Sequence, residues 1–185
     1  LSGRIAGKIA AANPGVGETL SRSSMPESLA GGISDQLPHD SAESIREIVE
    51  TLSKASGVSG PRQQVVRENS GRILASFIVK LNEPMGHVSI RNISFPGSRL
   101  PRVQFRDVEF ANVEFKRVDL VDARFDGCVG RGVYFDAPMV SPNTRLDIQG
   151  VIPIDSFIGV HLVGDTESKG VTYDPTEIEA ILRKL

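Results

Sequence analysis

The stretch RVQFRDVEFANVEFKRVDLVDARFDG, residues 102–127, places an apolar residue at the centre of each group of five. A regular β-strand would keep its apolar side chains on one parity, because successive side chains point to opposite faces. Here Val103 and Phe105 have odd numbers, whereas Val108 and Phe110 have even ones. A helix does not fit either, since residues two apart do not share a helix face. A chain that keeps both apolar residues inside must therefore turn a corner once in every unit of five.

The period of five continues over ten consecutive units, from about residue 87 to residue 141. Two positions before each centre stands a second residue, which is small and apolar in most units. A fixed short period predicts a solenoid, in which each repeat stacks on its neighbours. The centres are Ile90, Phe95, Leu100, Phe105, Phe110, Phe115, Leu120, Phe125, Gly130 and Phe135.

This pattern resembles the pentapeptide-repeat family, which has a small apolar residue first and Leu or Phe at the centre of each unit. The resemblance covers less than a third of the chain. It implies a mainly β fold: a short, right-handed, four-sided β-solenoid with four units in each coil, so that residues twenty apart stack. Ten units would then form about two and a half coils, with strands about 4.8 Å apart.

Stacking at twenty residues predicts which side chains meet. Gly130 breaks the ladder of Ile90 and Phe110, so we expect a void, a bulge or the end of the solenoid near it. The tract has eight Lys or Arg and seven Asp or Glu, which we expect to pair across coils. The predicted inner ladders are Phe95, Phe115 and Phe135; Phe105 and Phe125; and Leu100, Leu120 and Val140. The predicted outer pairs are Arg99–Asp119, Arg102–Asp122, Arg106–Asp126, Lys116–Asp136 and Asn92–Asn112.

Both ends of a short solenoid need caps, because they expose backbone groups and core. Residues 40–82 are predicted to form a helical cap of two amphipathic helices. The first begins at Asp40 or Ser41 and ends before Gly57. The second covers about 61–81, where Gly71 is a mild defect.

The remaining boundaries follow from composition and alternation. The solenoid is assigned to residues 83–145 and a C-terminal cap to 146–185. The cap would contain strands near 146–152 and 156–163, and a final helix after Asp174. Residues 1–39 are rich in Ser, Gly and Pro, which favours a loosely ordered linker or a segment separated from its partner.

No motif of this chain indicates catalysis, a cofactor or a metal. The loop AANPGVGETL, residues 11–20, resembles a phosphate-binding loop but has Glu18 where that motif has Lys. The single cysteine, Cys128, is at an inward position, which predicts a buried and inert thiol. The histidines, at positions 39, 87 and 161, lack neighbouring ligands at metal-binding spacing.

The composition is that of a globular, non-membrane chain in a reducing, cytoplasmic compartment. Its net charge of -2 gives no reason to expect binding to nucleic acid. Because the chain begins at Leu1 rather than Met, we expect it to be part of a larger protein. Tyr134 is an outward aromatic residue beside the Gly130 break, and with Arg131 it is the candidate contact for a partner.

These observations favour a non-catalytic protein-interaction, scaffolding or recognition module over an enzyme. By analogy with the resembled family, such a module would be attached to a larger bacterial signalling protein of the NTPase type. Two alternatives stay open. Some family members mimic DNA and inhibit gyrase, although this tract sums to +8 - 7 = +1. The other alternative is a nucleotide-binding enzyme fragment that uses the loop at 11–20. A homo-oligomer is a further hypothesis.

Overall fold

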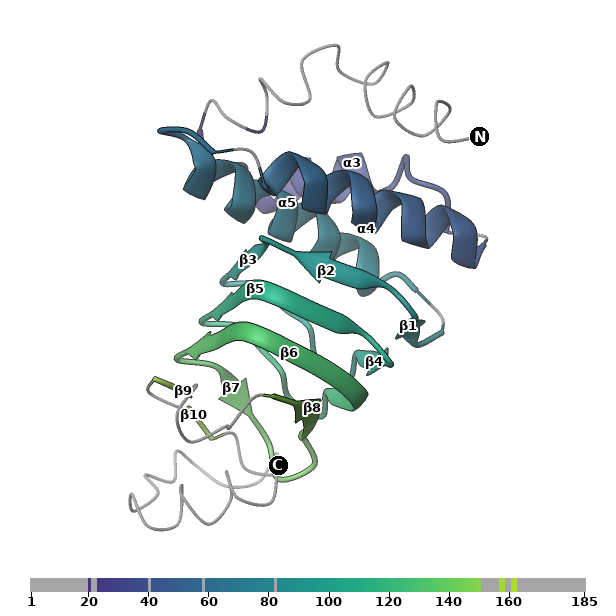
Figure 1. Cartoon of the computed structure of the whole chain (residues 1–185), viewed down its shortest axis with the longest axis vertical. Coiled ribbons are helices and arrows are strands. Elements are labelled where there is room, and N and C mark those ends of the chain that lie inside the picture. Colours follow the sequence, from purple (N-terminus) through teal and green to yellow (C-terminus); the bar gives the residue numbers. More distant parts are fainter. Residues whose placement is uncertain are drawn as a thin grey trace.

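The computed structural model describes residues 20, 23–39, 41–57, 59–81 and 83–150, and the backbone of 157–158 and 161–162. In this part of the chain, helices come first and lie across one end of a stack of strands (Figure 1). The helices are α3 (Glu27–Ser34), α4 (Ala42–Ser56) and α5 (Gln63–Ile78). The strands are β1 (Met85–Gly86), β2 (Ser89–Arg91), β3 (Ser94–Pro96), β4 (Gln104–Arg106), β5 (Glu109–Lys116), β6 (Arg124–Asp136), β7 (Met139–Val140), β8 (Arg145–Gln149), β9 (Phe157–Ile158) and β10 (His161–Leu162).

The strands form a parallel β-solenoid of about three coils. Met85 pairs with Phe105 and Phe105 with Phe125, so each coil is 20 residues long in this column. The column of Ile90 and Phe110 has the same register. A coil of this length contains four units of five. The mainly β solenoid predicted from the sequence is therefore confirmed.

The corners of the coil are residues with a left-handed backbone, one in every unit. Residues at every fifth position from 87 to 137 have φ between 48° and 62°, and most of them are not glycine. Such φ values are uncommon for residues with a Cβ, and Asn and Asp tolerate them best. The corner residues are His87, Asn92, Gly97, Arg102, Asp107, Asn112, Arg117, Asp122, Gly127, Gly132 and Ala137.

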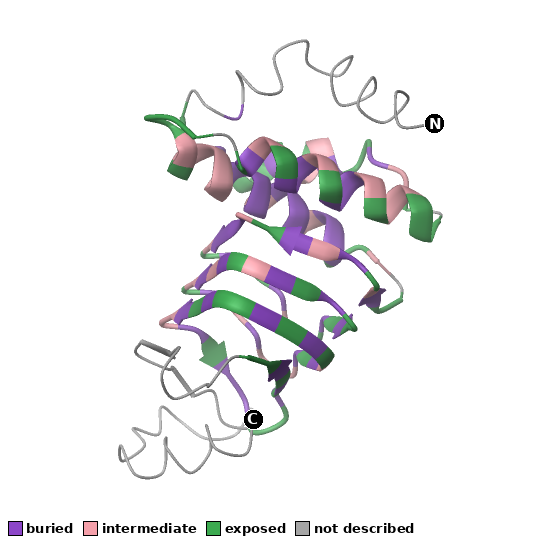
Figure 2. Ribbon diagram, in the orientation of Figure 1, coloured by how far each residue is buried: buried purple, intermediate pink, exposed green. Residues whose placement is uncertain are grey.

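The predicted Phe ladders fill the interior of the coils. The rings of Phe95, Phe115 and Phe135 stack nearly parallel, with centroids 5.1 and 4.9 Å apart. The Phe105 and Phe125 rings are 4.7 Å apart. All five side chains are fully buried. Figure 2 shows the resulting alternation of buried and exposed residues along β5 and β6.

Along its pairing with β5, β6 shows no interruption at Gly130. Gly130 pairs with Phe110, and the register continues to Phe135 and beyond. The expected deformation lies on the other edge of β6, two residues before Gly130: Phe125 pairs with Leu146, 21 residues away, and Cys128 pairs with Ile148 at 20. The backbone of Gly150 then lies so close to the Gly130 carbonyl that a Cβ on Gly150 would be 2.6 Å from that oxygen. Glycine at position 150 thus permits the last coil to close over β6.

The outer pairs are only partly formed as predicted. Asn112 donates to the side-chain oxygen of Asn92 at 2.9 Å, and Arg102 lies 3.9 Å from Asp122. The other three pairs are adjacent in register, but no ion pair joins the charged groups of these six described residues. Their cross-coil contribution to stability is therefore small, as is usual for exposed charges.

Helices α4 and α5 cap the first coil. The N-cap of helix α4 is Ser41, whose Oγ accepts a hydrogen bond from the Ser44 amide at 3.1 Å. Helix α5 begins two residues after Pro61, slightly later than predicted. α4 packs on β2 and α5 packs on β3.

Gly71 is the point at which α5 touches the solenoid backbone, so it is not a defect. A Cβ on Gly71 would lie 2.7 Å from the Ser94 carbonyl carbon, nearer still to its oxygen, and 3.2 Å from the Phe95 nitrogen. Only glycine permits this approach of helix to strand. Arg67, one turn earlier, donates to the carbonyl oxygens of Asn92 at 3.2 Å and Asn112 at 3.0 Å. It therefore ties α5 to two stacked corners that belong to neighbouring coils.

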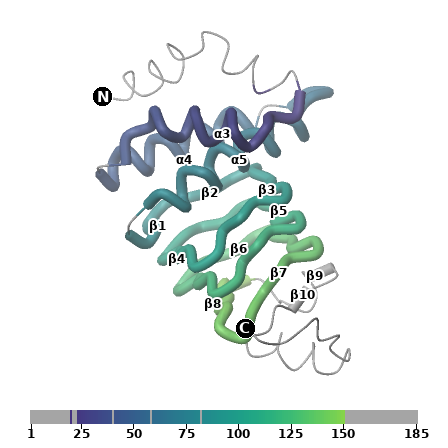
Figure 3. The backbone as a smooth tube through the Cα atoms, turned by 180° about the vertical axis from the view of Figure 1, so that it is seen from behind, coloured from purple at the N-terminus to yellow at the C-terminus, as the bar shows by residue number. Residues whose placement is uncertain are grey.

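Part of the segment 1–39, predicted as a loosely ordered linker, forms α3, which packs on α5. Figure 3 shows α3 from behind, lying along the other helices. The buried side chain of Asn69 holds the chain before α3: it donates to the carbonyls of Leu20 and Ser23 and accepts from the amide of Met25, all within 2.8 Å. The final helix predicted after Asp174 lies outside the described residues.

We predict that Gly71→Ala lowers the free energy of unfolding by about 3 kcal/mol, because the added methyl group collides with backbone rather than with a movable side chain. Urea denaturation followed by circular dichroism measures this. Gly32→Ala in α3 is the control: a Cβ there meets nothing within 4 Å, so the variant should gain about 0.5–1 kcal/mol. A Gly71→Ala protein as stable as the unsubstituted chain would contradict the packing described.

We also predict opposite effects of exchanging glycine and alanine at two corners. Gly97→Ala should cost about 1 kcal/mol, since φ is +60° and a Cβ there meets nothing within 4 Å. Ala137→Gly, where φ is 48°, should gain about 0.5–1 kcal/mol for the converse reason. Urea midpoints of the two variants test the corner assignment, and an increase in stability for Gly97→Ala would refute it.

Candidate functional site

Three successive sides of the third coil each carry an exposed apolar residue. Val129, Tyr134 and Met139 are 47%, 55% and 36% exposed, respectively. Each stands one position before an inward centre, on three successive units, and the corners between them are the small residues Gly132 and Ala137. We call Val129, Gly132, Tyr134, Ala137 and Met139 the apolar belt.

The same columns are acidic one coil earlier. Val129 pairs in register with Glu109, Tyr134 with Glu114, and Met139 with Asp119. These acids have partners: Glu109 binds Arg91, Glu114 lies near Arg67 and Lys116, and Asp119 accepts from the Val121 amide. In these three columns, the outer residue therefore changes from an acid with a partner to an apolar side chain within one strand spacing.

The two candidate contacts named from the sequence lie on either side of one corner. Tyr134 and Arg131 are both exposed on β6, separated by the corner at Gly132. No hydrogen bond, ion pair or ring contact joins these two described side chains. Val129 and Met139 were missed, although comparing the residue before each centre from coil to coil would have found them.

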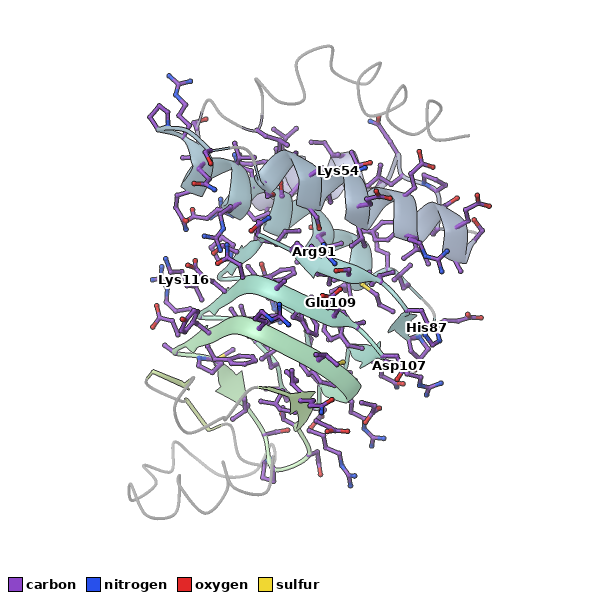
Figure 4. All side chains as sticks on the ribbon, in the orientation of Figure 1. Lys54, His87, Arg91, Asp107, Glu109 and Lys116 are labelled. Atoms are coloured by element: carbon purple, nitrogen blue, oxygen red, sulfur yellow. The ribbon has the colours of Figure 1, made fainter. Side chains whose placement is uncertain are left out.

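A second surface feature is a groove of about 750 Å³ between α4 and the first two coils. Figure 4 shows Lys54 on α4 above Arg91 of β2 and Glu109 of β5, with His87 toward β1. This volume is in the range of ligand-binding pockets. The groove is lined by Arg46, Glu50, Ser53, Lys54 and Gly57 of α4 and its C-cap, and by His87, Val88, Ser89, Arg91, Asn92 and Glu109 of the solenoid.

The floor of the groove is a fixed polar network. Arg91 donates to the Ser89 hydroxyl at 2.7 Å and to Glu109 Oε2 at 2.9 Å, and Ser89 donates to the same oxygen at 2.8 Å. The Arg91 and Ser89 hydrogen bonds hold the pKa of Glu109 below its usual range. On the helical wall, the Lys54 ammonium 2.6 Å away likewise lowers the pKa of Glu50. Both carboxylates are thus ionised at neutral pH.

The other chemical groups singled out from the sequence do not converge. Cys128 is buried at 1% exposure, His39 stacks on the Phe77 ring, and His87 Nδ1 is 3.8 Å from an Asp107 carboxylate oxygen. Within the described residues, no group of three His, Cys, Asp or Glu side chains is placed to hold a metal ion. The loop at 11–20, apart from Leu20, and the His161 side chain lie outside the described residues.

Within the same part of the chain, no helix combines the length and the apolar character that crossing a bilayer needs. Comparison with known proteins gives no assignment: no protein-family model, no curated protein and no solved structure matches the chain.

We predict that Cys128 is unreactive in the folded protein. Burial raises the pKa of its thiol to about 11, so about one molecule in a thousand carries the thiolate at pH 8. Iodoacetamide at pH 8, followed by mass spectrometry, should leave the native chain unmodified and alkylate it in guanidinium chloride. Rapid alkylation of the native chain would contradict this.

The same shift predicts a pH dependence of stability. Because the folded pKa is raised, the thiol's contribution is present below pH 9 and decreases as the pH rises from 9 toward 11. Urea unfolding of the parent chain should show this decrease. A Cys128→Ala variant should lack that increment, and parallel pH curves for the two proteins would refute the prediction.

Proposed function

We propose that the chain is a non-catalytic recognition module that binds a protein partner through the apolar belt. The observation that carries this proposal is the exposure of Val129, Tyr134 and Met139 on one coil. Exposed apolar surface marks interaction sites in soluble proteins, and Tyr, here at the centre of the belt, is enriched among residues that dominate binding energy. Arg131, beside the belt, would supply orientation through its guanidinium group.

The belt suits recognition because its scaffold is rigid. Val129, Tyr134 and Met139 each stand next to a buried centre and are held by parallel pairing to β5 or to Asp119. Binding of a partner would therefore not require the backbone of the solenoid to become ordered, which would cost affinity.

The corner residue at every fifth position and the 20-residue register support assigning the tract to the pentapeptide-repeat family. By analogy with that family alone, the module would belong to a larger bacterial signalling protein of the NTPase type and act in the cytoplasm. The charge of the tract, eight basic against seven acidic residues, favours protein recognition over mimicry of DNA, which needs an acidic surface.

Photo-crosslinking tests the proposal. We expect p-benzoylphenylalanine introduced in place of Tyr134, in cells that naturally express the protein, to form discrete protein adducts that mass spectrometry identifies. The double substitution Val129→Asp and Met139→Asp should abolish them, because it places charge in an apolar contact. An adduct of twice the chain's mass would identify a second copy as the partner.

The matched control places the same photoreactive group at Gln104, an exposed residue of β4 that lies six units earlier in the chain, on the side of the solenoid opposite Tyr134. It should give no discrete adduct. Equal adducts at both positions, or none at position 134, would overturn the proposal.

A further inference from the structure

We propose that the groove between α4 and the first two coils binds an extended acidic peptide segment of about five residues. This site is separate from the apolar belt, because none of its lining residues belongs to the belt.

The charges of the groove favour an acidic ligand. Arg46, Lys54 and Arg91 line it together with the two carboxylates of Glu50 and Glu109. Each carboxylate is already paired with one cation, Glu50 with Lys54 and Glu109 with Arg91. Arg46 makes no ion pair or hydrogen bond with any described residue. The groove therefore has one uncompensated positive charge before His87 is considered.

The unused hydrogen-bond donors point to the same class of ligand. Two Arg and one Lys side chain carry about 13 N–H donors between them. Three of these donors have protein acceptors: two from Arg91 and one from Lys54. A ligand rich in carboxylate oxygens would satisfy several of the rest through charge-assisted hydrogen bonds.

The separation of Arg46 and Lys54 along α4 sets the spacing of the ligand's charges. Arg46 and Lys54 are eight residues apart on α4, about 12 Å along the helix axis. An extended peptide covers this distance in about four residues. Side chains at i, i+2 and i+4 of such a peptide share one face, so acidic residues at i and i+4 could meet both cations. The residue at i+2 would then face the groove, where Val88 supplies an apolar contact.

The wall that α4 forms also determines how such a peptide can bind. Arg91 donates its backbone N–H to Ser53 Oγ at 3.1 Å, so α4 already occupies the edge of β2 and prevents the ligand from adding as another strand. Recognition would therefore come from side chains, which makes binding dependent on salt concentration.

Fluorescence anisotropy on the whole chain tests this with the labelled peptide Glu-Thr-Val-Thr-Glu, blocked at both ends. We expect measurable binding that weakens with added salt. We expect the variant with Arg46→Gln and Lys54→Gln to bind about tenfold more weakly. The control with Arg124→Gln and Arg145→Gln changes the net charge equally at exposed positions away from the groove, and should keep the parent affinity.

Matched probes decide between the peptide and other ligands. Lys-Thr-Val-Thr-Lys should not bind, and Glu-Thr-Thr-Glu, whose carboxylates point to opposite faces, should bind more weakly. Inorganic phosphate at equal concentration should not compete. Absence of binding, equal binding of the lysine peptide, equal loss in the control variant, or competition by phosphate would each overturn the proposal. Tyr134→Ala should leave peptide affinity unchanged, which separates this site from the belt.

Discussion

One left-handed residue in every five is the constraint on which this structure depends. The corner turns the chain by one side of the coil, so the next pair of apolar residues again points inward even though its numbering has changed parity. Most corner residues are not glycine, and each of these carries a cost of about 1–2 kcal/mol. Burial of six Phe rings and close ring stacking offset this cost. Repetition of the corner therefore determines the core and the register together.

The helical cap depends on contacts of a different kind, made at single points. Gly71 lets α5 approach the backbone of β3, and Arg67 reaches two successive corners from the same helix. Asn69, between them in sequence, faces the other way and binds the segment before α3. One turn of α5 thus holds the solenoid on one side and the N-terminal segment on the other.

The regular interior leaves the outer surface free to vary from coil to coil. Columns whose backbone positions are equivalent carry serine or arginine, then acids, then apolar residues: Ser89, Glu109 and Val129 form one such column, and Arg99, Asp119 and Met139 another. The core does not constrain these side chains, because they point outward on strands whose inward residues already fill the coil. The belt and the groove are two features of this variable outer surface.

The sequence by itself determined the solenoid, because a period of five with two inward apolar positions requires a corner in every unit. The stacking of residues twenty apart, and with it the inner ladders, was implied by the resemblance to the pentapeptide-repeat family. The sequence also predicted that Tyr134 is exposed. Only the tertiary structure decided the role of Gly71, the helix within residues 1–39, and the gathering of Arg46 and Lys54 opposite Arg91. Each of these depends on contacts between segments distant in sequence, and no local period encodes such contacts. Likewise, Lys116 and Asp136 are paired in register but form no ion pair, and Lys116 lies near Glu114 instead. The register determines the positions of the backbones, but it does not determine which charged groups of exposed side chains come together.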